Sequence, residues 1–212
     1  MRVLITGASR GIGAQMQSQM QTRGDVVTGT TRNGTGAQLD VTDPASFETL
    51  KRQFGDEPLD LLVCNAGVFP DRDATLVDGY PADMWADVMA ANVTGVFLTI
   101  QTFLPNVKAA KGKIAIISSQ MGSSTKVGGG SYIYRASKAA VSNLGFNLAA
   151  DLKADGISVG VYHPGWVRTD MGGDAAAVSP HDSAAGLIQR FDALSLDTTG
   201  CFETYDGTPH PA

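Results

Sequence analysis

The chain has 212 residues, of which 43% are hydrophobic and 17% are charged, a composition typical of a compact folded protein and not of a disordered one. Its 16 Lys and Arg residues against 21 Asp and Glu residues give a formal net charge of −5. This balance argues against nucleic acid or an anionic membrane as a partner, because both attract basic proteins. The length suits one core, so we expect residues 1–212 to form a single domain.

The start of the sequence and its cysteines and histidines bear on compartment and metal binding. A strand-like run, Val3–Ile5, begins two residues from the start, which leaves no space for the regions of a signal peptide. No stretch of the sequence approaches the ~18 apolar residues of a membrane span. The cysteines, Cys64 and Cys201, and the three histidines do not cluster at ligand spacing. We therefore expect a cytoplasmic protein without a metal site.

Short apolar runs alternate with helical patterns along the whole chain. Runs such as Leu61–Val63 and Ile114–Ile117 are apolar on consecutive residues, which is typical of parallel strands buried on both faces. The sequence predicts an α/β fold, a single doubly wound (Rossmann-like) parallel sheet with helices on both faces. In chain order we expect strands over 2–6, 25–31, 59–65, 112–118, 157–163 and 200–204, and helices over 11–23, 43–54, 81–104, 133–154 and 180–194.

A glycine-rich turn joins the first expected strand to the first helix. Gly7, Gly11 and Gly13 lie in the spacing G-x-x-x-G-x-G. Glycines there allow close backbone approach, and a helix N-terminus offers free N–H groups to a pyrophosphate. A purely structural tight turn is the alternative. The strand before it and the helix after it favour a dinucleotide site.

The turn Thr6-Gly7-Ala8-Ser9-Arg10-Gly11-Ile12-Gly13 resembles the cofactor loop of the short-chain dehydrogenases/reductases. Further matches follow in the family's order over nearly the whole chain: Asp40-Val41, Asn65-Ala66-Gly67, Asn92 within Ala91–Gly95, Ser118-Ser119, Tyr134–Lys138 and His163–Thr169. The segment 163–173 and the late Gly200–Phe202 and Tyr205–Gly207 look similar to the branch that holds C-factor and the sniffer-type carbonyl reductases.

This resemblance implies a nicotinamide dinucleotide cofactor and an oxidoreductase activity. The residues that the resemblance assigns to the cofactor are Gly7, Ser9, Arg10, Gly11, Ile12, Gly13, Thr31, Arg32, Asp40, Val41, Asn65, Ala66, Gly67, Tyr134, Lys138, Pro164, Gly165, Val167 and Thr169.

The end of the second expected strand bears on the choice between NAD and NADP. An acidic residue there accepts hydrogen bonds from a free ribose 2′-hydroxyl. The position falls at Thr31 with Arg32 next, and no Asp or Glu lies between Val26 and Gly36. A guanidinium matches the geometry of a 2′-phosphate, and Arg10 would supply a second charge. Each arginine alone could be a solvated surface group, but together they favour NADP (NADPH) over NAD.

The candidate catalytic residues include a tyrosine and a lysine four positions apart. Tyr134 and Lys138 share one face of the expected helix, where a nearby ammonium would lower the phenol pKa from its usual ~10. The resemblance assigns Tyr134 as general acid/base and Lys138 as its activator and a ribose ligand. Ser119 would hydrogen-bond the substrate carbonyl, with Ser118 as the alternative, and Asn92 would hold a water in a proton relay.

The expected substrate pocket is mostly apolar, with walls at Phe69, Met121, Val127, Tyr132, Trp166 and Met171. We predict reduction of an aldehyde or ketone to an alcohol with NADP(H), acting on a small-molecule carbonyl or alcohol. The alternative is a C-factor-like signalling protein that binds a dinucleotide without needing turnover. A nucleotide-sugar epimerase or dehydratase would need a larger C-terminal domain. Surplus apolar residues on the helices over 81–104 and 133–154 predict a homodimer or homotetramer.

Overall fold

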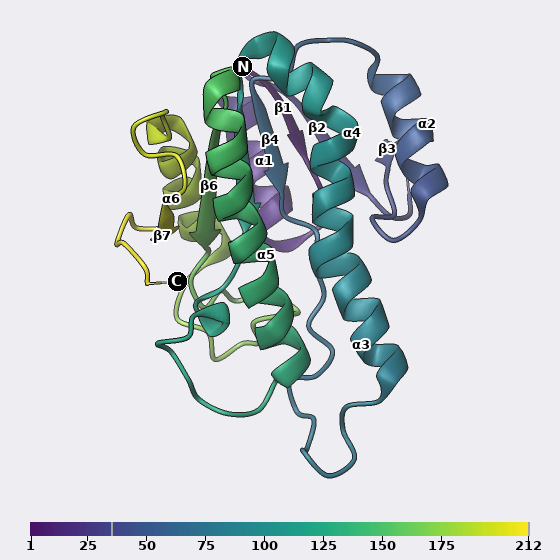
Figure 1. Cartoon of the computed structure of the whole chain (residues 1–212), viewed down its shortest axis with the longest axis vertical. Coiled ribbons are helices and arrows are strands. Elements are labelled where there is room, and N and C mark those ends of the chain that lie inside the picture. The colour runs from purple at the N-terminus through teal and green to yellow at the C-terminus, as the bar shows by residue number, and fades with distance from the viewer. Residues whose placement is uncertain (35, 212) are drawn as a thin grey trace.

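The computed structural model describes residues 1–34 and 36–211, and its centre is one parallel sheet (Figure 1). The strand order is β3-β2-β1-β4-β5-β6-β7, so the chain winds outward from β1 in both directions. This arrangement confirms the doubly wound α/β prediction, with the change of direction between β1 and β4. The strands are β1 (Arg2–Ile5), β2 (Val26–Thr31), β3 (Ala37–Gln38), β4 (Leu61–Cys64), β5 (Lys113–Ile117), β6 (Ser158–His163) and β7 (Phe202–Thr204).

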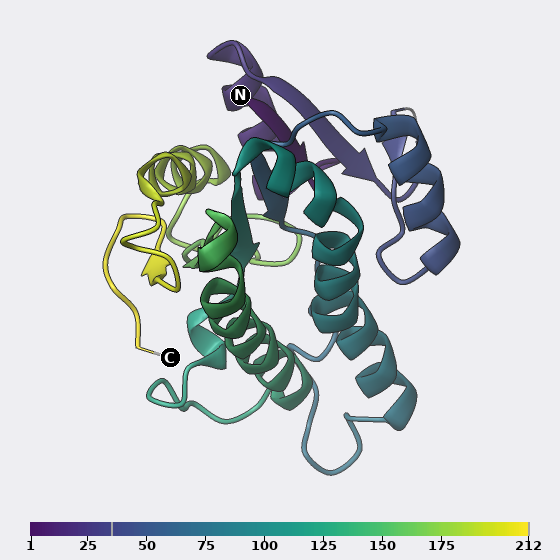
Figure 2. The same ribbon diagram turned by 45° about the horizontal axis from the view of Figure 1, so that its top comes forward.

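Helices cover both faces of the sheet, as Figures 1 and 2 show. On one face lie α2 (Pro44–Phe54), α4 (Gly95–Ala110) and α5 (Tyr132–Leu152), and on the other lie α1 (Gly11–Thr22) and α6 (Pro180–Ala193). Helix α3 (Ala82–Met89) continues into α4 through a π turn over Ala90–Thr94. Short 3₁₀ turns over Gln120–Gly122 and Lys153–Asp155 complete the helical segments.

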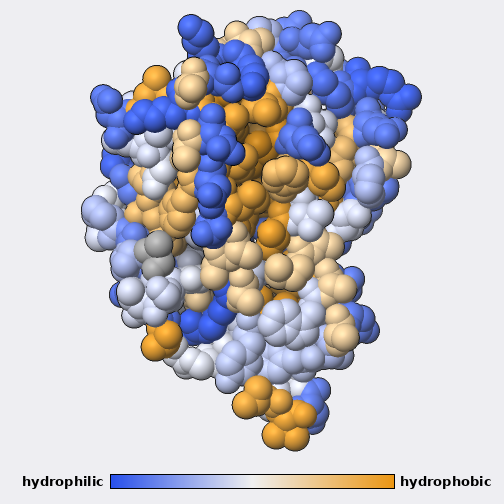
Figure 3. All heavy atoms as spheres, viewed as in Figure 1, coloured by the Kyte–Doolittle hydropathy of each residue, from blue (hydrophilic) through white to orange (hydrophobic). Residues whose placement is uncertain are grey.

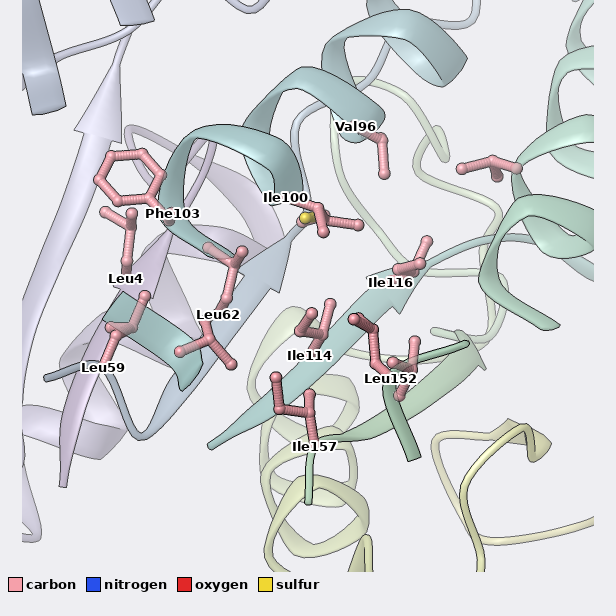
Figure 4. Close-up of a cluster of buried hydrophobic side chains, with 14 of the residues drawn as sticks. Leu4, Leu59, Leu62, Val96, Ile100, Phe103, Ile114, Ile116, Leu152 and Ile157 are labelled. Carbon is pink, nitrogen blue, oxygen red and sulfur yellow. The ribbon is translucent and has the colours of Figure 1, made fainter. Parts of the chain in front are cut away.

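Alternation along the central strands divides the core into two layers. Leu4, Leu62 and Ile114 point toward α4 and α5, where they meet Ile100 and Phe103 (Figure 4). Their strand neighbours point the other way, onto α1 and α6: Val3, Ile5, Leu61, Val63, Ala115 and Ile117. Because both faces are buried, the strands have no polar face, which explains their continuous apolar sequence.

Two elements differ from the sequence prediction. Strand β3 has only two residues, Ala37–Gln38, which is too short for any periodic pattern to reveal. The helix expected over 81–104 continues past Pro105 to Ala110. A proline inside a helix removes one backbone hydrogen bond, but Phe103 and Val107 on either side of it are fully buried against the sheet, and this packing holds the last turn together.

The continuous helix over Ala82–Ala110 is long and apolar enough, by length and composition alone, to cross a membrane. This corrects the expectation that no stretch approaches a span. Its most apolar window is 44% buried inside the fold, and Ile100, Phe103 and Val107 supply the largest buried side chains of α4. The apolar composition therefore has a second explanation, which is the packing of this helix on the sheet.

Candidate active site

The first cavity lies at the carboxyl ends of β1, β4 and β5 and has a volume of about 280 Å³. Such a cleft at the point where strand order reverses is the usual ligand site of an open parallel sheet. The sequence-predicted cofactor residues that line it are Gly7, Ser9, Arg10, Ile12, Gly13, Arg32, Asp40, Val41, Asn65, Ala66, Gly67, Tyr134, Lys138, Pro164 and Thr169.

Four predicted cofactor residues lie elsewhere. Gly165 and Val167 line a second cavity, described below, and neither Gly11 nor Thr31 lines the first one. Gly11 instead packs beside Thr169, since a Cβ at Gly11 would lie 3.3 Å from the Thr169 methyl carbon. The hydroxyl of Thr31 donates to the carbonyl of Asn33 and so stabilises the loop that carries Arg32.

The glycine turn brings the first turn of α1 against the cavity. Gly13 approaches the backbone so closely that a Cβ there would lie 2.3 Å from the Gly7 carbonyl oxygen. Arg10 occupies the capping position of α1 but makes no side-chain capping hydrogen bond. The early N–H groups of α1 therefore have no side-chain acceptor at that position, and a helix end of this kind favours an anion.

Asn65, directly after β4, ties two loops of this cavity together. Its Nδ2 donates to the carbonyls of Thr6 and Gly7 at 3.0 and 2.9 Å. The hydroxyl oxygen of Thr6 in turn accepts from the backbone N–H groups of Asn65 and Ala66. The glycine turn is thereby fixed to the Asn-Ala-Gly turn on the neighbouring strand.

Tyr134 and Lys138 lie one turn apart on α5 and are both buried. The Lys138 ammonium lies 5.6 Å from the centre of the Tyr134 ring and donates to the Ile117 carbonyl at 3.0 Å. Ser119 follows β5 and hydrogen-bonds the Tyr134 side chain. The structure thus brings the predicted serine, tyrosine and lysine together at one point.

The geometry separates the two candidate serines. Ser118 bonds to the Lys138 carbonyl and the Ser142 hydroxyl of α5, so its side chain is engaged with that helix. The hydroxyl of Ser119 faces Tyr134 and accepts from the Met121 N–H. Gly122, three residues after Ser119, must lack a side chain, because a Cβ there would lie 2.5 Å from the Lys138 carbonyl carbon.

Burial dominates the ionisation of this pair. It raises the pKa of Tyr134 to about 12, against smaller lowering effects of the Ser119 hydrogen bond and the Arg72 charge. Burial also lowers the pKa of Lys138 to about 8. The expectation of a lowered phenol pKa is therefore wrong: the pKa is raised, since loss of solvation outweighs the favourable neighbours.

Asn92 lies in the π turn between α3 and α4 and is fully buried. Its Oδ1 accepts from the Val68 N–H at 2.8 Å, and its Nδ2 donates to the Val68 carbonyl and the Ser137 hydroxyl. The side chain thus joins the loop after β4 to α5. A bulge of this type inserts one residue into a helix and often marks a functional position.

Asp71 is a buried residue that the sequence analysis missed. Its Oδ2 accepts from the N–H groups of Ile133 and Tyr134 at 2.9 and 3.2 Å, at the start of α5. The residue before the helix, Ser131, has φ +48° and makes no side-chain capping bond, so a carboxylate from a distant loop caps α5 in its place. No local capping motif signals such a contact in the sequence.

The second cavity, of about 470 Å³, adjoins the first one, and Tyr134 lines both. Four predicted substrate residues line it: Phe69, Met121, Trp166 and Met171. The Phe69 ring stacks on Tyr134 with centroids 4.0 Å apart. Two predicted wall residues do not line it. Tyr132 packs edge-on against Tyr80 instead, and Val127 is 85% exposed.

Two further residues of the second cavity, His163 and Arg72, were not predicted to face substrate. His163 is buried at the end of β6, and burial lowers its pKa to about 4, which keeps the ring neutral. Arg72 follows Asp71 in the loop after β4 and lies over the Phe69 ring. In the sequence, His163 stands out only as the residue before Pro164-Gly165, and no motif includes Arg72.

Comparison with known proteins identifies relatives along almost the entire chain. The model of the family described as short chain dehydrogenase matches residues 1–178. The 1-hydroxy-2-glutathionyl-2-methyl-3-butene dehydrogenase of Rhodococcus sp. (strain AD45) is 33% identical over an alignment that covers 97% of each protein. The C-signal of Myxococcus xanthus is 36% identical over 73% of this chain and 93% of its own length.

Solved structures of carbonyl reductases are also similar to this chain over its whole length. The NADPH-bound carbonyl reductase from chicken fatty liver superposes with a TM-score of 0.88 and 27% identity, covering 100% of this chain and 98% of that one. The carbonyl reductase Sniffer of D. melanogaster superposes with a TM-score of 0.92 and 26% identity, covering 100% and 99%. The resemblance to the C-factor and sniffer-type branch is thereby confirmed.

The lowered pKa of Lys138 predicts a pH-dependent stability. Between pH about 8 and the unfolded value of 10.5, the unfolded chain keeps the lysine proton and the folded chain has lost it. The free energy of unfolding therefore rises with pH in that window relative to a variant without the lysine. Urea denaturation at pH 7 and pH 10 should show wild type gaining on the order of 2 kcal/mol over Lys138→Met. Lys153→Met, at an exposed lysine, is the control. If the difference in free energy of unfolding between wild type and Lys138→Met is the same at both pH values, the lowered pKa of Lys138 is contradicted.

The capping contact of Asp71 predicts a graded loss of stability. Asp71→Ala leaves the buried N–H groups of Ile133 and Tyr134 without their acceptor and should lower the free energy of unfolding by about 1–3 kcal/mol. Asp71→Asn keeps an acceptor oxygen and should lose less. Asp73→Ala, at an exposed neighbour, should change stability by less than about 0.5 kcal/mol. Equal losses for the alanine and asparagine variants at position 71, measured in urea, contradict the capping role.

Proposed function

The chain belongs to the short-chain dehydrogenase family, and on this basis we propose that it reduces an aldehyde or ketone to an alcohol with NADPH. One observation carries the proposal: Tyr134 lies at the junction of the two cavities, with Ser119 hydrogen-bonded to it and Lys138 one turn away. The first cavity would hold the dinucleotide and the second the carbonyl compound.

The residues around the first cavity fit a dinucleotide. The close approach at Gly13 and the open N-terminus of α1 suit a pyrophosphate, and Asp40 and Val41 would lie beside the adenine. Lys138 would donate to the nicotinamide ribose, since two of its N–H groups remain beyond the bond to Ile117. The cofactor supplies the hydride that reduces the carbonyl carbon.

The side chains of this protein would bind and protonate the carbonyl oxygen. The hydroxyls of Ser119 and Tyr134 would donate hydrogen bonds to it, which polarises the carbonyl and holds it in place. Tyr134 would give its proton to the oxygen as the alcohol forms, and Lys138 would stabilise the phenolate that remains. Asn92 fixes the loop after β4 against α5, and we propose that it also supports the water that returns a proton toward Lys138.

Two arginines at the mouth of the first cavity favour NADP over NAD. Arg32 and Arg10 both line this cavity. Arg10 forms an exposed ion pair with Asp170 at 2.7 Å, and Arg32 lies near enough to Asp40 to lower the pKa of that carboxyl, although the Thr42 hydrogen bonds lower it more. A 2′-phosphate would complete a guanidinium cluster on this side. The bound NADPH of the chicken carbonyl reductase agrees with this choice.

A signalling role without turnover is the second candidate, because the chain is 36% identical to the C-signal of Myxococcus xanthus.

We further propose a single domain in the cytoplasm that assembles as a homodimer or homotetramer through α4 and α5. Figure 3 shows apolar side chains gathered on this face. Phe97 is 39% exposed there, and Leu104, Leu144 and Leu148 are only half-buried.

Replacing the central tyrosine tests the reaction. Tyr134→Phe removes one hydroxyl and keeps the ring, so turnover in an NADPH-oxidation assay over a panel of carbonyl compounds should fall ~10²–10⁴-fold. Tyr132→Phe, which lies outside both cavities, should retain turnover. Loss of turnover in the Tyr132 variant alone would reverse the choice of tyrosine. Tight NADPH binding with no carbonyl reduced by wild type would favour the signalling role.

A second substitution tests the cofactor choice. Arg32→Ala should weaken NADPH binding by about 1.5–3 kcal/mol, as for a hydrogen bond to a charged group, and leave NADH binding nearly unchanged. Calorimetric titration of each cofactor measures both affinities. Arg52→Ala, an arginine on α2 that does not line the first cavity, is the control. Equal losses for NADPH and NADH contradict a contact with the 2′-phosphate.

A further inference from the structure

The second cavity has an unequal distribution of charge. Apolar side chains such as Phe69, Met121 and Met171 make up much of its wall. Arg72 is the one permanently charged side chain among the described residues that line it, and no Asp or Glu lines it. His163 is neutral at physiological pH, because burial lowers its pKa to about 4. A ligand in this cavity therefore meets a single positive charge that no acidic wall residue offsets.

Arg72 reaches this position by stacking on a ring that faces the candidate catalytic tyrosine. Its guanidinium carbon lies 5.4 Å from the centre of the Phe69 ring, and the centres of the Phe69 and Tyr134 rings are 4.0 Å apart. On its other side, a Cβ at Gly173 would come within 3.2 Å of the Arg72 Nη1. The guanidinium thus lies between the loop after β4 and the segment after β6, and the Phe69 ring separates it from Tyr134.

Two acidic side chains in the segments beside Arg72, Asp71 and Asp170, have other partners. The carboxylate of Asp71 is buried and caps α5, and Asp170 pairs with Arg10 at 2.7 Å. Within residues 1–34 and 36–211, Arg72 forms no ion pair and no hydrogen bond, and its guanidinium lies over the Phe69 ring. Its planar, permanently charged fork of N–H donors therefore remains available for a carboxylate or phosphate.

We propose that Arg72 binds an anionic group of the substrate, so that the substrates are aldehydes or ketones with a short apolar body and a carboxylate or phosphate at the far end. This inference rests on the proposed carbonyl reduction. The carbonyl lies at Ser119 and Tyr134, the apolar body lies along Phe69, Met121 and Trp166, and the anion reaches Arg72. Arg72 is a specificity-determining residue in this arrangement.

A pair of substrates that differ only in charge tests the proposal. 4-Formylbenzoate and its methyl ester share one aromatic aldehyde, and the wild-type kcat/KM for the anion should exceed that for the ester by about tenfold at low salt. Most of the difference should appear in KM, since the anion lies away from the reacting carbon. The preference should shrink toward one in 1 M salt, because salt screens a partly exposed charge pair.

Variants at position 72 assign the preference to one side chain. Arg72→Gln should reduce the anion-to-ester ratio to about one, and Arg72→Lys should keep part of it. Because the anion-to-ester ratio compares two aldehydes in the same variant, a disturbance of Tyr134 that slows both reactions equally leaves the ratio unchanged. Arg52→Gln, with the same loss of charge on α2, should keep the full wild-type preference. Equal wild-type values for the two aldehydes, or a preference that survives Arg72→Gln, would overturn the proposal.

A binding measurement separates this proposal from the proposed reaction. Calorimetric titration of 4-formylbenzoate and its ester into the NADP⁺-loaded protein reports the charge preference without turnover. Binding of the anion that depends on Arg72, together with no reduction of any carbonyl, supports the anion site and contradicts the reductase activity. Turnover of both aldehydes with equal affinities supports the reductase and contradicts the anion site.

Discussion

Burial of both faces of the parallel sheet is the constraint on which the rest of this structure depends. With α2, α4 and α5 on one side and α1 and α6 on the other, the central strands have no exposed face on which a polar side chain could lie. Polar groups gather where the strands end instead. Because all seven strands are parallel, these ends lie along one edge, and residues as distant in sequence as Thr6, Asn65 and Ser119 come together there.

The loops at this edge are fixed by a few side-chain hydrogen bonds. Asn65 joins the glycine turn to the loop after β4, Asn92 joins that loop to α5, and Asp71 caps the start of α5. The Asn92 amide and the Asp71 carboxylate are buried, and such groups are costly without a partner. The position of Tyr134 thus results from contacts made by three separate segments, and the same contacts surround Lys138 with an environment that disfavours its charge.

Much of this fold could be predicted from the sequence, because continuous apolar strands and spaced glycines have direct physical causes. The helix spacing of Tyr134 and Lys138 and the glycine three positions after Ser119 likewise reflect local geometry that the structure explains. Asp71 was missed because its partners lie 62 and 63 residues further along the chain, at the start of α5, and no local pattern encodes such a contact. Arg72 is close to Phe69 in the sequence, but no local pattern shows that its guanidinium lies over that ring and lines the second cavity. The direction of the Tyr134 pKa shift was missed for the same reason, since burial is a property of the assembled fold.

The π turn at Ala90–Thr94 has a consequence for how this chain can change in length. A bulge of this kind holds one residue more than a regular helical turn, and each helical residue turns the chain by about 100°. Deletion of one residue here would restore an unbroken α-helix and rotate α3 by that angle relative to α4. Val88, which faces inward now, would leave the interior, and the bonds between Asn92 and Val68 would be lost. The number of residues in this helix pair is therefore fixed by the geometry of the π turn.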